Sequence, residues 1–393
     1  MHAVGIICEY NPFHNGHAYH IAKAREISGA DYVVCAMSGA LTQRGTFARH
    51  DKWTRARMAL LGGADLVLEL PARFACAPAQ EFSAGGVALL SSLGVVTHLS
   101  FGCESEAISG LEHAQRLLSD ETPAFRDALR EGLDAGRSFP RSRAHALDAC
   151  CEDEAVRAAL ALPNAALALE YLAALPEGIA PVPVMREGSG YHDTALCGLP
   201  SATGVRHALA EGRLDQALPA VPSPQLLQSA EERGDLHEED ALDQALLYCL
   251  RSMSAEQLEN ICGMDEGLQH RFIAAAQRCA SRKKLIEAVK TKRYTWARLS
   301  RLCSCAMLGV TRETAAAYPL PTYARVLGFK KSAAPLMRSI KERGALPLVV
   351  KAADYGDPLY ALDIRAQDLW SLGCRDVQLR ACGRDYITGP VIL

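Results

Sequence analysis

Three histidines stand within seven positions in the stretch EYNPFHNGHAYH, residues 9–20, directly after a short apolar run. Imidazole rings can bind a metal ion, donate hydrogen bonds to phosphate, or simply order a loop. Pro12 excludes a central strand here, and Gly16 lets the backbone approach a ligand, so we expect a loop that leads into a helix. A helix start presents unpaired N–H groups and the positive end of the helix dipole. We therefore interpret His14 and His17 as a phosphate site whose rings stabilise charge that builds up in a transition state.

Two other interpretations of these histidines stay open at this point. Zinc needs further Cys, His or carboxylate ligands, and only Glu9 and His20 are close in the sequence. A purely structural loop is the other possibility. The 14 cysteines are scattered without any C-x-x-C pair, which favours reduced, mostly buried thiols over disulfides or zinc. No metal ligand is therefore predicted.

The elements that must position these residues alternate between short β-branched runs and helical patterns over the first two hundred residues. This alternation is typical of an α/β fold with a mainly parallel sheet covered on both faces. We expect strands at 3–8, 31–37, 64–70, 95–101 and 181–186, and helices near 16–28, 51–62 and 79–93, with a more purely helical stretch at about 105–175. His14 then lies in the loop after the first strand, and His17 lies near the first helical turn.

A proline-rich segment, LPAVPSPQ at 218–225, interrupts this pattern. A chain of 393 residues is too long for one ordinary core, so we place a domain boundary there. Residues 1–217 are predicted to form the α/β domain and residues 218–393 a mainly helical domain. Within the second domain we expect helices at 238–251, 254–262, 265–280 and 294–308, and one small strand at 346–351.

Charge is unevenly distributed along the chain. The net charge is -3, yet residues 278–343 hold sixteen Lys or Arg and three Glu, a local charge of +13. A basic face on an acidic protein attracts polyanions, although a solvated helix surface has the same composition. Tyr294 and Trp296 lie within the basic run KTKRYTWAR and favour a nucleic-acid partner.

The overall composition is that of an ordinary globular protein, with 49 % hydrophobic and 22 % charged residues. No apolar run reaches the length of a membrane span, and the N-terminus lacks the pattern of a secretory signal. We therefore expect a cytoplasmic protein with no membrane partner.

The tetrapeptide HNGH at residues 14–17 resembles the H-x-G-H signature of the nucleotidylyltransferase superfamily. Its position between the first predicted strand and the first predicted helix makes the match much more specific than four letters alone. The resemblance implies a Rossmann-like sheet that binds ATP and directs attack on its α-phosphate.

The superfamily has a second motif, S-x-T-x-x-R, which the segment SATGVR matches with Ser201, Thr203 and Arg206. The resemblance implies that this element holds the β and γ phosphates, which leave as pyrophosphate. A helix N-terminus with two hydroxyls and a guanidinium suits that task on physical grounds. A plain serine cap with an exposed arginine is the structural alternative.

Segments along nearly the whole chain resemble the tRNA(Met) cytidine acetate ligase family, among them GIICEYNPFHNGHAYHI, QRGTFARHDKWTRARMALLGGADLVLELP, LPNAALALEYL, REGSGYHD and KTKRYTWARLSRL. The resemblance implies an ATP-dependent ligase, with Mg²⁺ bridging the phosphates, that forms acetyl-adenylate from acetate. The acetyl group would then pass to the wobble cytidine of elongator tRNA(Met), giving N(4)-acetylcytidine. The implied partners are acetate and tRNA, without DNA, and the oligomeric state is left open.

The resemblance also assigns residues within the two domains. Residues 1–217 become the nucleotidylyltransferase-like, ATP-binding catalytic domain, with His14 and His17 as catalytic residues, and residues 218–393 become the tRNA-binding domain. The residues assigned to ATP are Ile7, Cys8, Glu9, Tyr10, Asn11, Pro12, Phe13, His14, Asn15, Gly16, His17, His20, Gly102, Asn164, Arg186, Ser201, Thr203 and Arg206. The residues assigned to RNA are Lys290, Lys292, Arg293 and Tyr294, with Tyr294 stacking on a base, whereas Trp296 is expected in the core.

The chain departs from the family's usual pattern at a few positions. It has Ala40-Leu41 where the family has Asn-Phe, Cys103 where the family has Ser, Ala165 where the family has a second Asn, and Gly204-Val205 where the family has Ala-Ile. Every H-x-G-H residue is present.

Two competing functions follow from the same residues. One is a nucleotidylyltransferase that transfers AMP to a small phosphorylated or carboxylated metabolite, although such an enzyme needs little beyond the first domain. The other is an RNA-binding or assembly protein with a vestigial nucleotide fold, which the intact motif residues argue against.

Overall fold

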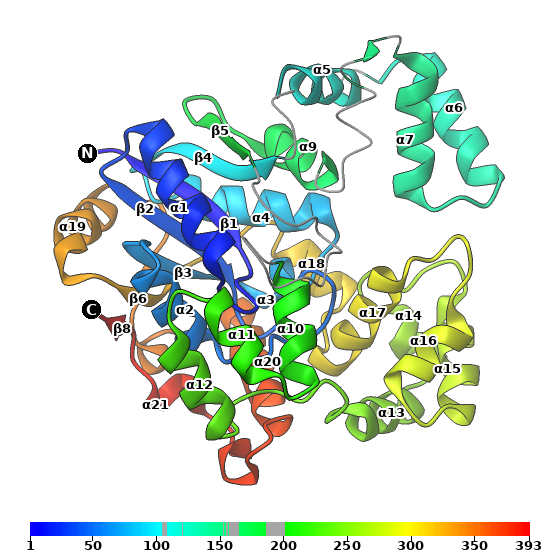
Figure 1. The fold of residues 1–393 in the computed structure, drawn as a ribbon. Helices are drawn as coiled ribbons and strands as arrows, with labels where there is room; N and C mark the ends of the chain where they lie inside the picture. Colours follow the sequence, from blue (N-terminus) through cyan, green and yellow to red (C-terminus); the bar gives the residue numbers. More distant parts are fainter. Residues whose placement is uncertain (104–107, 120, 152, 155, 157–164, 186–200) are drawn as a thin grey trace.

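The computed structural model describes residues 1–103, 108–119, 121–151, 153–154, 156, 165–185 and 201–393. An eight-stranded sheet in the order β5-β4-β1-β2-β3-β6-β7, with β8 paired to β6, forms its centre (Figure 1). The strands are β1 Ala3–Cys8, β2 Tyr32–Ser38, β3 Leu66–Leu70, β4 Val96–Cys103, β5 Ala180–Met185, β6 Ala324–Phe329, β7 Leu348–Val349 and β8 Val391–Ile392. The first five strands pair in parallel, which confirms the predicted α/β class and parallel sheet.

Helices account for most of the remaining chain. In the first part they are α1 Asn15–Ser28, α2 Lys52–Leu61, α3 Ala72–Ala75, α4 Ala79–Ser91, α5 Ile108–Ser119, α6 Pro123–Asp134, α7 Phe139–Cys150, α9 Ala165–Ala174, α10 Ala202–Ala210 and α11 Leu214–Ala217. In the second part they are α12 Pro224–Glu232, α13 Asp243–Ser252, α14 Ala255–Glu259, α15 Leu268–Arg278, α16 Arg282–Val289, α17 Trp296–Leu308, α18 Arg312–Ala317, α19 Ala334–Arg343, α20 Pro358–Leu372 and α21 Arg384–Ile387. Among the described residues no helix is long and apolar enough to cross a membrane.

Alternating side chains of the central strands fill two cores, one on each face of the sheet. In β2, Val33 and Cys35 belong to the core that includes residues of α1 and α2, whereas Val34 and Ala36 belong to the core that includes residues of α4. This is the period-two alternation of a strand buried on both faces. Helix α4 lies close against β1, since a Cβ at Gly86 would stand 2.6 Å from Ile7 Cδ1. These layers place the carboxyl end of β1 and the start of α1 at one edge of the sheet (Figure 1).

The end of the chain returns to the same sheet. Strand β6 pairs antiparallel with β3, and β7 and β8 pair with β6, so the sheet contains residues from both sides of the predicted boundary at 217/218. That boundary stays a prediction. Buried ion pairs join the same parts of the chain: Lys52 Nζ lies 2.8 Å from Glu69 Oε2 and 2.8 Å from Asp385 Oδ1. Removing one partner from such a group would leave an uncompensated buried charge.

The helices α13–α17 pack on one another to one side of the sheet (Figure 1). The observed bounds of α13, α14, α15 and α17 agree with the four predicted helices to within a few residues at most ends, whereas α16 was not predicted. Strand β6 was not predicted, because its sequence ARVLGF is short and carries a charged residue. Arg325 is nevertheless fully buried there, with its Nη2 3.5 Å from Asp385 Oδ1.

Candidate active site

A cavity of about 1000 Å³ opens at the carboxyl ends of β1, β4 and β5. It is lined by thirteen of the residues that the sequence assigned to ATP: Ile7, Cys8, Glu9, Tyr10, Asn11, His14, Gly16, His17, His20, Gly102, Ser201, Thr203 and Arg206. Segments predicted to be far apart, 7–20 and 201–206, therefore meet in one place. Asn164 and Arg186 lie outside the described residues.

Three residues of the first loop serve the fold and do not line the cavity. Phe13 is fully buried in the core, and Pro12 beside it is buried as well. Asn15 donates a hydrogen bond from Nδ2 to the Pro219 carbonyl, 2.9 Å away, which ties the start of α1 to the proline-rich segment. These side chains position the loop, and their assignment to ATP stays a prediction.

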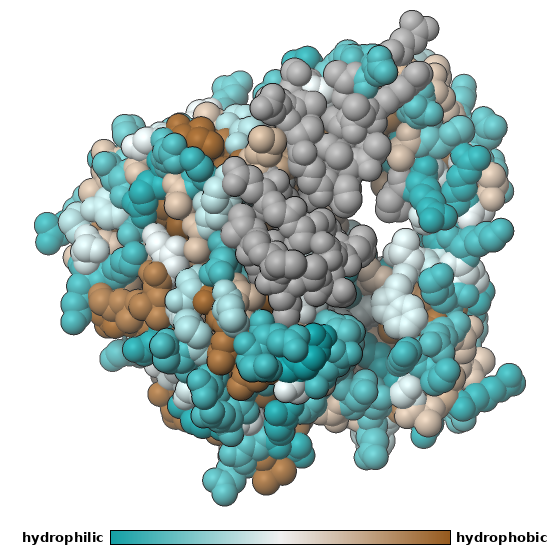
Figure 2. Space-filling model, viewed as in Figure 1, coloured by the Kyte–Doolittle hydropathy of each residue, from teal (hydrophilic) through white to brown (hydrophobic). Residues whose placement is uncertain are grey.

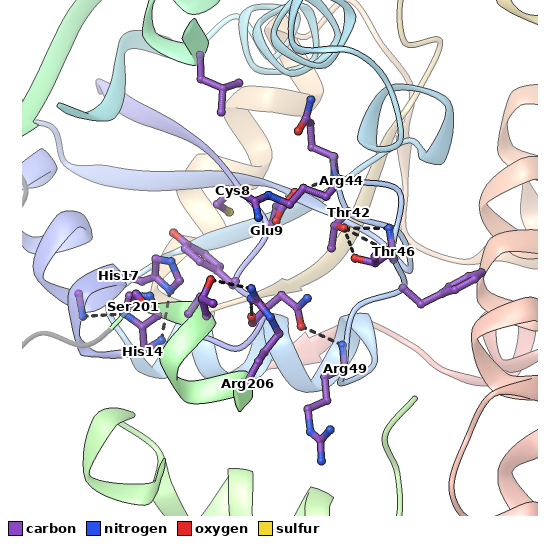
Figure 3. A pocket seen from close by; sticks show the side chains of 18 of the residues that line it. Cys8, Glu9, His14, His17, Thr42, Arg44, Thr46, Arg49, Ser201 and Arg206 are labelled. Atoms are coloured by element: carbon purple, nitrogen blue, oxygen red, sulfur yellow. Dashed lines mark hydrogen bonds between the residues drawn. The ribbon is translucent and has the colours of Figure 1, made fainter. Parts of the chain in front are cut away.

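The rings of His14 and His17 are stacked, with their centroids 3.7 Å apart (Figure 3). Together they cap α1: the Gly16 N–H donates to His14 Nδ1 at 3.1 Å, and the His14 N–H donates to His17 Nδ1 at 3.2 Å. A backbone N–H can only donate, so both Nδ1 atoms accept. In each neutral ring the proton then sits on Nε2, which makes Nε2 a hydrogen-bond donor. The helix cap thus selects the tautomer that suits an anionic ligand.

The second motif begins α10 on the other side of the first loop. Ser201 caps this helix by accepting from the Gly204 N–H at 3.0 Å, which is the role that the structural alternative gave it, and its assignment to ATP stays a prediction. Arg206 donates from Nη2 to Thr203 Oγ1 at 3.1 Å and from Nη1 to the Asn11 carbonyl. Its guanidinium is thereby fixed between the two motifs (Figure 3). The two helix starts and one arginine make an arrangement suited to a polyphosphate.

Arg49, an arginine that sequence reasoning missed, lines the same cavity and supports this arrangement. The Arg49 N–H donates to Asn11 Oδ1 at 2.9 Å, and the Arg49 guanidinium forms two parallel bonds of 2.6 Å to the Glu231 carboxylate. His50 Nε2 lies 2.9 Å from the same carboxylate. Burial acts to raise the pKa of Glu231, but the hydrogen bonds from Arg49 and His50 outweigh it and lower the pKa to about 2. Helix α12 therefore holds Arg49, and Arg49 holds Asn11.

A second missed residue organises the ends of β1 and β2. Arg55 is fully buried and donates to the carbonyls of Glu9 at 2.7 Å and Ser38 at 2.9 Å, and to the Gly39 carbonyl. Burial lowers the pKa of Arg55 to about 10, so the group stays charged at neutral pH. Its partners are backbone atoms, and no side-chain pattern in the sequence could have indicated them.

The loop at 42–47 joins the cavity to the C-terminal helices. Arg282 of α16 donates from Nη2 to the Gly45 carbonyl and to Ser300 Oγ, the latter at 2.8 Å. Gly45 has a φ of 75°, and a Cβ there would stand 2.4 Å from the Arg301 backbone nitrogen of α17. Only glycine fits this contact without strain. The loop carries Arg44, an exposed residue that lines the cavity (Figure 3).

The aromatic pair of the basic run is placed opposite to our expectation. Tyr294 is 7 % exposed and belongs to the core, so its ring is not available for a base, whereas Trp296 is 41 % exposed and lines the cavity. The reason is local: Thr295 is the N-cap of α17, so Tyr294 and Leu299 hold the two positions of a hydrophobic staple. Reading Thr295 as a cap would have predicted this. Trp296 is the first helical residue and holds neither of these two positions.

The cations assigned to RNA, Lys290, Lys292 and Arg293, are all exposed. Arg293 forms an ion pair with Glu266, and at such exposure the pair contributes little to stability. These residues precede α17, close in the chain to Trp296. Their role stays a prediction.

Four of the departures from the family pattern lie outside the cavity lining. Ala40, Cys103, Ala165 and Gly204 are all buried and none of them lines the cavity. These four departures therefore replace no side chain of the cavity lining. No disulfide joins the cysteines of the described residues.

Comparisons with known proteins agree with this geometry. The family described as HIGH Nucleotidyl Transferase matches residues 1–385. The tRNA(Met) cytidine acetate ligase of Acetivibrio thermocellus is 33 % identical over 100 % of both chains, and that of Caldanaerobacter subterraneus is 35 % identical over 96 % of each. The crystal structure of Thermotoga maritima TmcAL bound with alpha-thio ATP superposes with a TM-score of 0.91, at 32 % identity over 100 % of both chains. The chain belongs to the tRNA(Met) cytidine acetate ligase family, within the HIGH nucleotidyl transferases.

Proposed function

We propose that this protein is an ATP-dependent ligase that activates acetate as acetyl-adenylate and transfers the acetyl group to the wobble cytidine of elongator tRNA(Met), giving N(4)-acetylcytidine. The observation that carries the proposal is the pair of stacked imidazoles, each held with Nε2 as a donor, at a helix start that faces Arg206 across one cavity. Full-length relatives named as this ligase support it. A cytoplasmic location stays a prediction.

In the first step an acetate oxygen attacks the α-phosphate of ATP in line, and the bond to pyrophosphate breaks. The Nε2–H groups of His14 and His17 donate to the crowded, negatively charged phosphorus centre. Thr203 and Arg206 hold the leaving pyrophosphate at the start of α10. No covalent bond to the enzyme forms, so positioning and charge stabilisation supply the rate.

We propose that Mg²⁺ accompanies ATP. Among the described residues no group of three or more His, Cys, Asp or Glu side chains could hold a metal ion. Mg²⁺ commonly binds through substrate phosphates and waters with few protein ligands, and it would supply charge neutralisation of the triphosphate. No step of the mechanism is routed through it.

In the second step the exocyclic amine of the cytidine attacks the acetyl carbonyl, and AMP leaves. The basic segment before α17 supports RNA as the acceptor, with Lys290, Lys292 and Arg293 as phosphate contacts.

The test is incubation with ATP, Mg²⁺, labelled acetate and bulk tRNA. We expect label on cytidine in tRNA and acetate-dependent exchange of pyrophosphate into ATP. Acetate-dependent exchange without label on tRNA would point to a different acceptor, and a carboxylate-independent transfer of AMP would support the metabolite nucleotidylyltransferase. If the protein catalyses neither the exchange of pyrophosphate nor the labelling of tRNA, the proposal is refuted.

A second experiment tests the basic segment. Replacing Lys292 and Arg293 by Ala should weaken tRNA binding and flatten its salt dependence by about one unit of slope per lost contact. Lys341, an exposed lysine on α19 on another side of the sheet, is the matched control and should change neither quantity (Figure 1). Unchanged tRNA affinity together with weaker ATP binding would show that this segment is not the RNA site.

A further inference from the structure

The sequence contains three tryptophans, and only one of them is accessible. Trp53 is 5 % exposed and Trp370 is fully buried, whereas Trp296 is 41 % exposed. Leaving a large indole in contact with water forgoes the stabilisation that burial would give it. An aromatic ring held at the wall of a cavity is instead suited to bind a flat ligand.

Trp296 differs from the other exposed aromatic side chains in its position. Phe139, Tyr248 and Tyr386 are also exposed, but among the described phenylalanines, tyrosines and tryptophans Trp296 is the only exposed one that lines the cavity; the smaller ring of His207 is exposed there as well. It shares this cavity with the catalytic histidines of the first loop. A ligand in contact with Trp296 therefore occupies the same chamber in which acetyl-adenylate would form.

The backbone that carries Trp296 is fixed. The residue begins α17, whose cap, Thr295, accepts a hydrogen bond from the Arg298 N–H at 3.3 Å. One turn further along, Ser300 Oγ donates to the Gly45 carbonyl of the cavity loop at 3.1 Å. The indole is thus attached to a rigid helix start that is bonded directly to the loop beside the first motif.

Basic residues precede Trp296 in the chain and share its cavity, which the carboxylates Glu238, Glu239 and Asp240 also line. Arg282 and Lys283 of α16 line the same cavity, and the exposed Lys290, Lys292 and Arg293 lie between α16 and α17. An aromatic ring surrounded by cations that contact the backbone is the usual chemistry for binding single-stranded nucleic acid. A cytidine that leaves its stack to react needs such a surface.

We propose that Trp296 is the surface on which the acceptor cytosine stacks during acetyl transfer. This role rests on the proposed function, because it requires tRNA to be the acceptor. The segment before α17 holds the phosphates next to the reactive nucleotide, and Trp296 holds its base. Base stacking, which we expected of Tyr294, is thus assigned to Trp296.

The kinetic test compares Trp296→Ala, Trp296→Phe and the control Tyr248→Ala. Loss of one stacking contact should lower kcat/KM for tRNA acetylation by about 5-fold to 150-fold in Trp296→Ala, while phenylalanine keeps an aromatic face and restores most of the loss. The ratio of tRNA acetylation to acetate-dependent pyrophosphate exchange should fall in the alanine variant. Tyr248 is 76 % exposed on α13 and does not line the cavity, so its replacement should leave this ratio unchanged.

The physical test uses the fluorescence of the wild-type protein. Because the other two tryptophans are buried, quenching by acrylamide reports on Trp296. Binding of tRNA should protect this fluorescence, and a tRNA that is abasic at the wobble position should bind without protecting it.

The outcomes separate the inference from the function on which it rests. If the wild type acetylates tRNA and Trp296→Ala does so equally well, the inference is wrong and the proposed function stands. Protection of the fluorescence by ATP alone, or equal protection by the abasic tRNA, would assign the indole to another ligand and also overturn the inference. If the wild type places no label on tRNA, the proposed function fails and the inference falls with it.

Discussion

Replacing His14 separates the two tasks that the structure gives to this ring. As N-cap of α1 it accepts the Gly16 N–H through Nδ1, at 3.1 Å, and as a proposed catalytic residue it donates through Nε2. Asparagine is as good an N-cap as any residue but cannot place a donor where Nε2 lies. Alanine supplies neither an acceptor nor a donor. Both variants therefore lose the Nε2 donor, but only His14→Ala also loses the helix cap.

The expected magnitudes differ for stability and for rate. Loss of the cap in His14→Ala should lower the free energy of unfolding by about 1 kcal/mol, whereas His14→Asn should stay within a few tenths of the wild type. Loss of a donor to the transition state should reduce the rate of adenylate formation by about 100-fold to 1,000-fold in both variants. Stability should thus distinguish the two variants, and rate should not.

Urea unfolding measures the first quantity, and acetate-dependent exchange of pyrophosphate into ATP measures the second. His270→Asn is the matched control, since His270 is an exposed histidine on α15 that does not line the cavity. The reasoning about the donor is refuted if His14→Asn retains exchange to within about 5-fold of the wild type, a loss far below that of a transition-state donor. The reasoning about the cap is refuted if the two variants unfold with the same free energy.

Three further predictions concern the residues that hold the site. The pKa of Glu231 is lowered from 4.5 to about 2 in the folded protein. The stability that its ionised carboxylate contributes is therefore complete above pH 4.5 and is lost as the pH falls toward 2. Urea unfolding should show that Glu231→Gln is less stable than the wild type at about pH 7, and that the difference in free energy of unfolding is smaller at about pH 3. Gly45→Ala should cost more stability than Gly136→Ala, because both glycines have a positive φ but only a Cβ at Gly45 meets backbone; equal costs would contradict the close contact. Arg206→Lys should raise the KM for ATP by roughly 10-fold, because a lysine ammonium cannot bond the Asn11 carbonyl, Thr203 Oγ1 and a phosphate at the same time. An unchanged KM would exclude Arg206 from the ATP site.

The parts of this structure that sequence predicts best are those with a local signal. The strands β1 to β5 and the helix after β1 follow from short apolar runs, turn residues and the spacing of Ala18, Ile21 and Ala22, each of which acts within a few residues. The position of His14 at a helix start follows from the same signals. The stacking of its ring on His17 and the shared cap could not be predicted, because they depend on side-chain rotamers.

Contacts between distant segments give no such signal. Arg49 and Glu231 are 182 positions apart, and Lys52 and Asp385 are 333 apart, so no periodicity connects them. Each of these charges looks like ordinary surface composition in the sequence. Only the folded chain makes them partners: α12 brings Glu231 to Arg49, and the C-terminal part that follows β6, paired with β3, brings Asp385 to Lys52. The burial of Tyr294 and the exposure of Trp296, by contrast, could have been predicted from the sequence, because the cap at Thr295 is a local signal.

The chemistry of the proposed intermediate explains why one cavity should be lined by both parts of the chain. Acetyl-adenylate is a mixed anhydride, and water competes with the cytidine amine for its carbonyl carbon, so release between the two steps would waste ATP. The acceptor base must therefore reach the intermediate where it forms. Residues of the first loop, such as His17, and residues of the C-terminal helices, such as Trp296, line the same cavity, and Arg282 bonds the two parts together through the Gly45 carbonyl. On this reasoning, a variant that loosens the Arg282 contact should form acetyl-adenylate but lose a larger share of it to water for each tRNA modified.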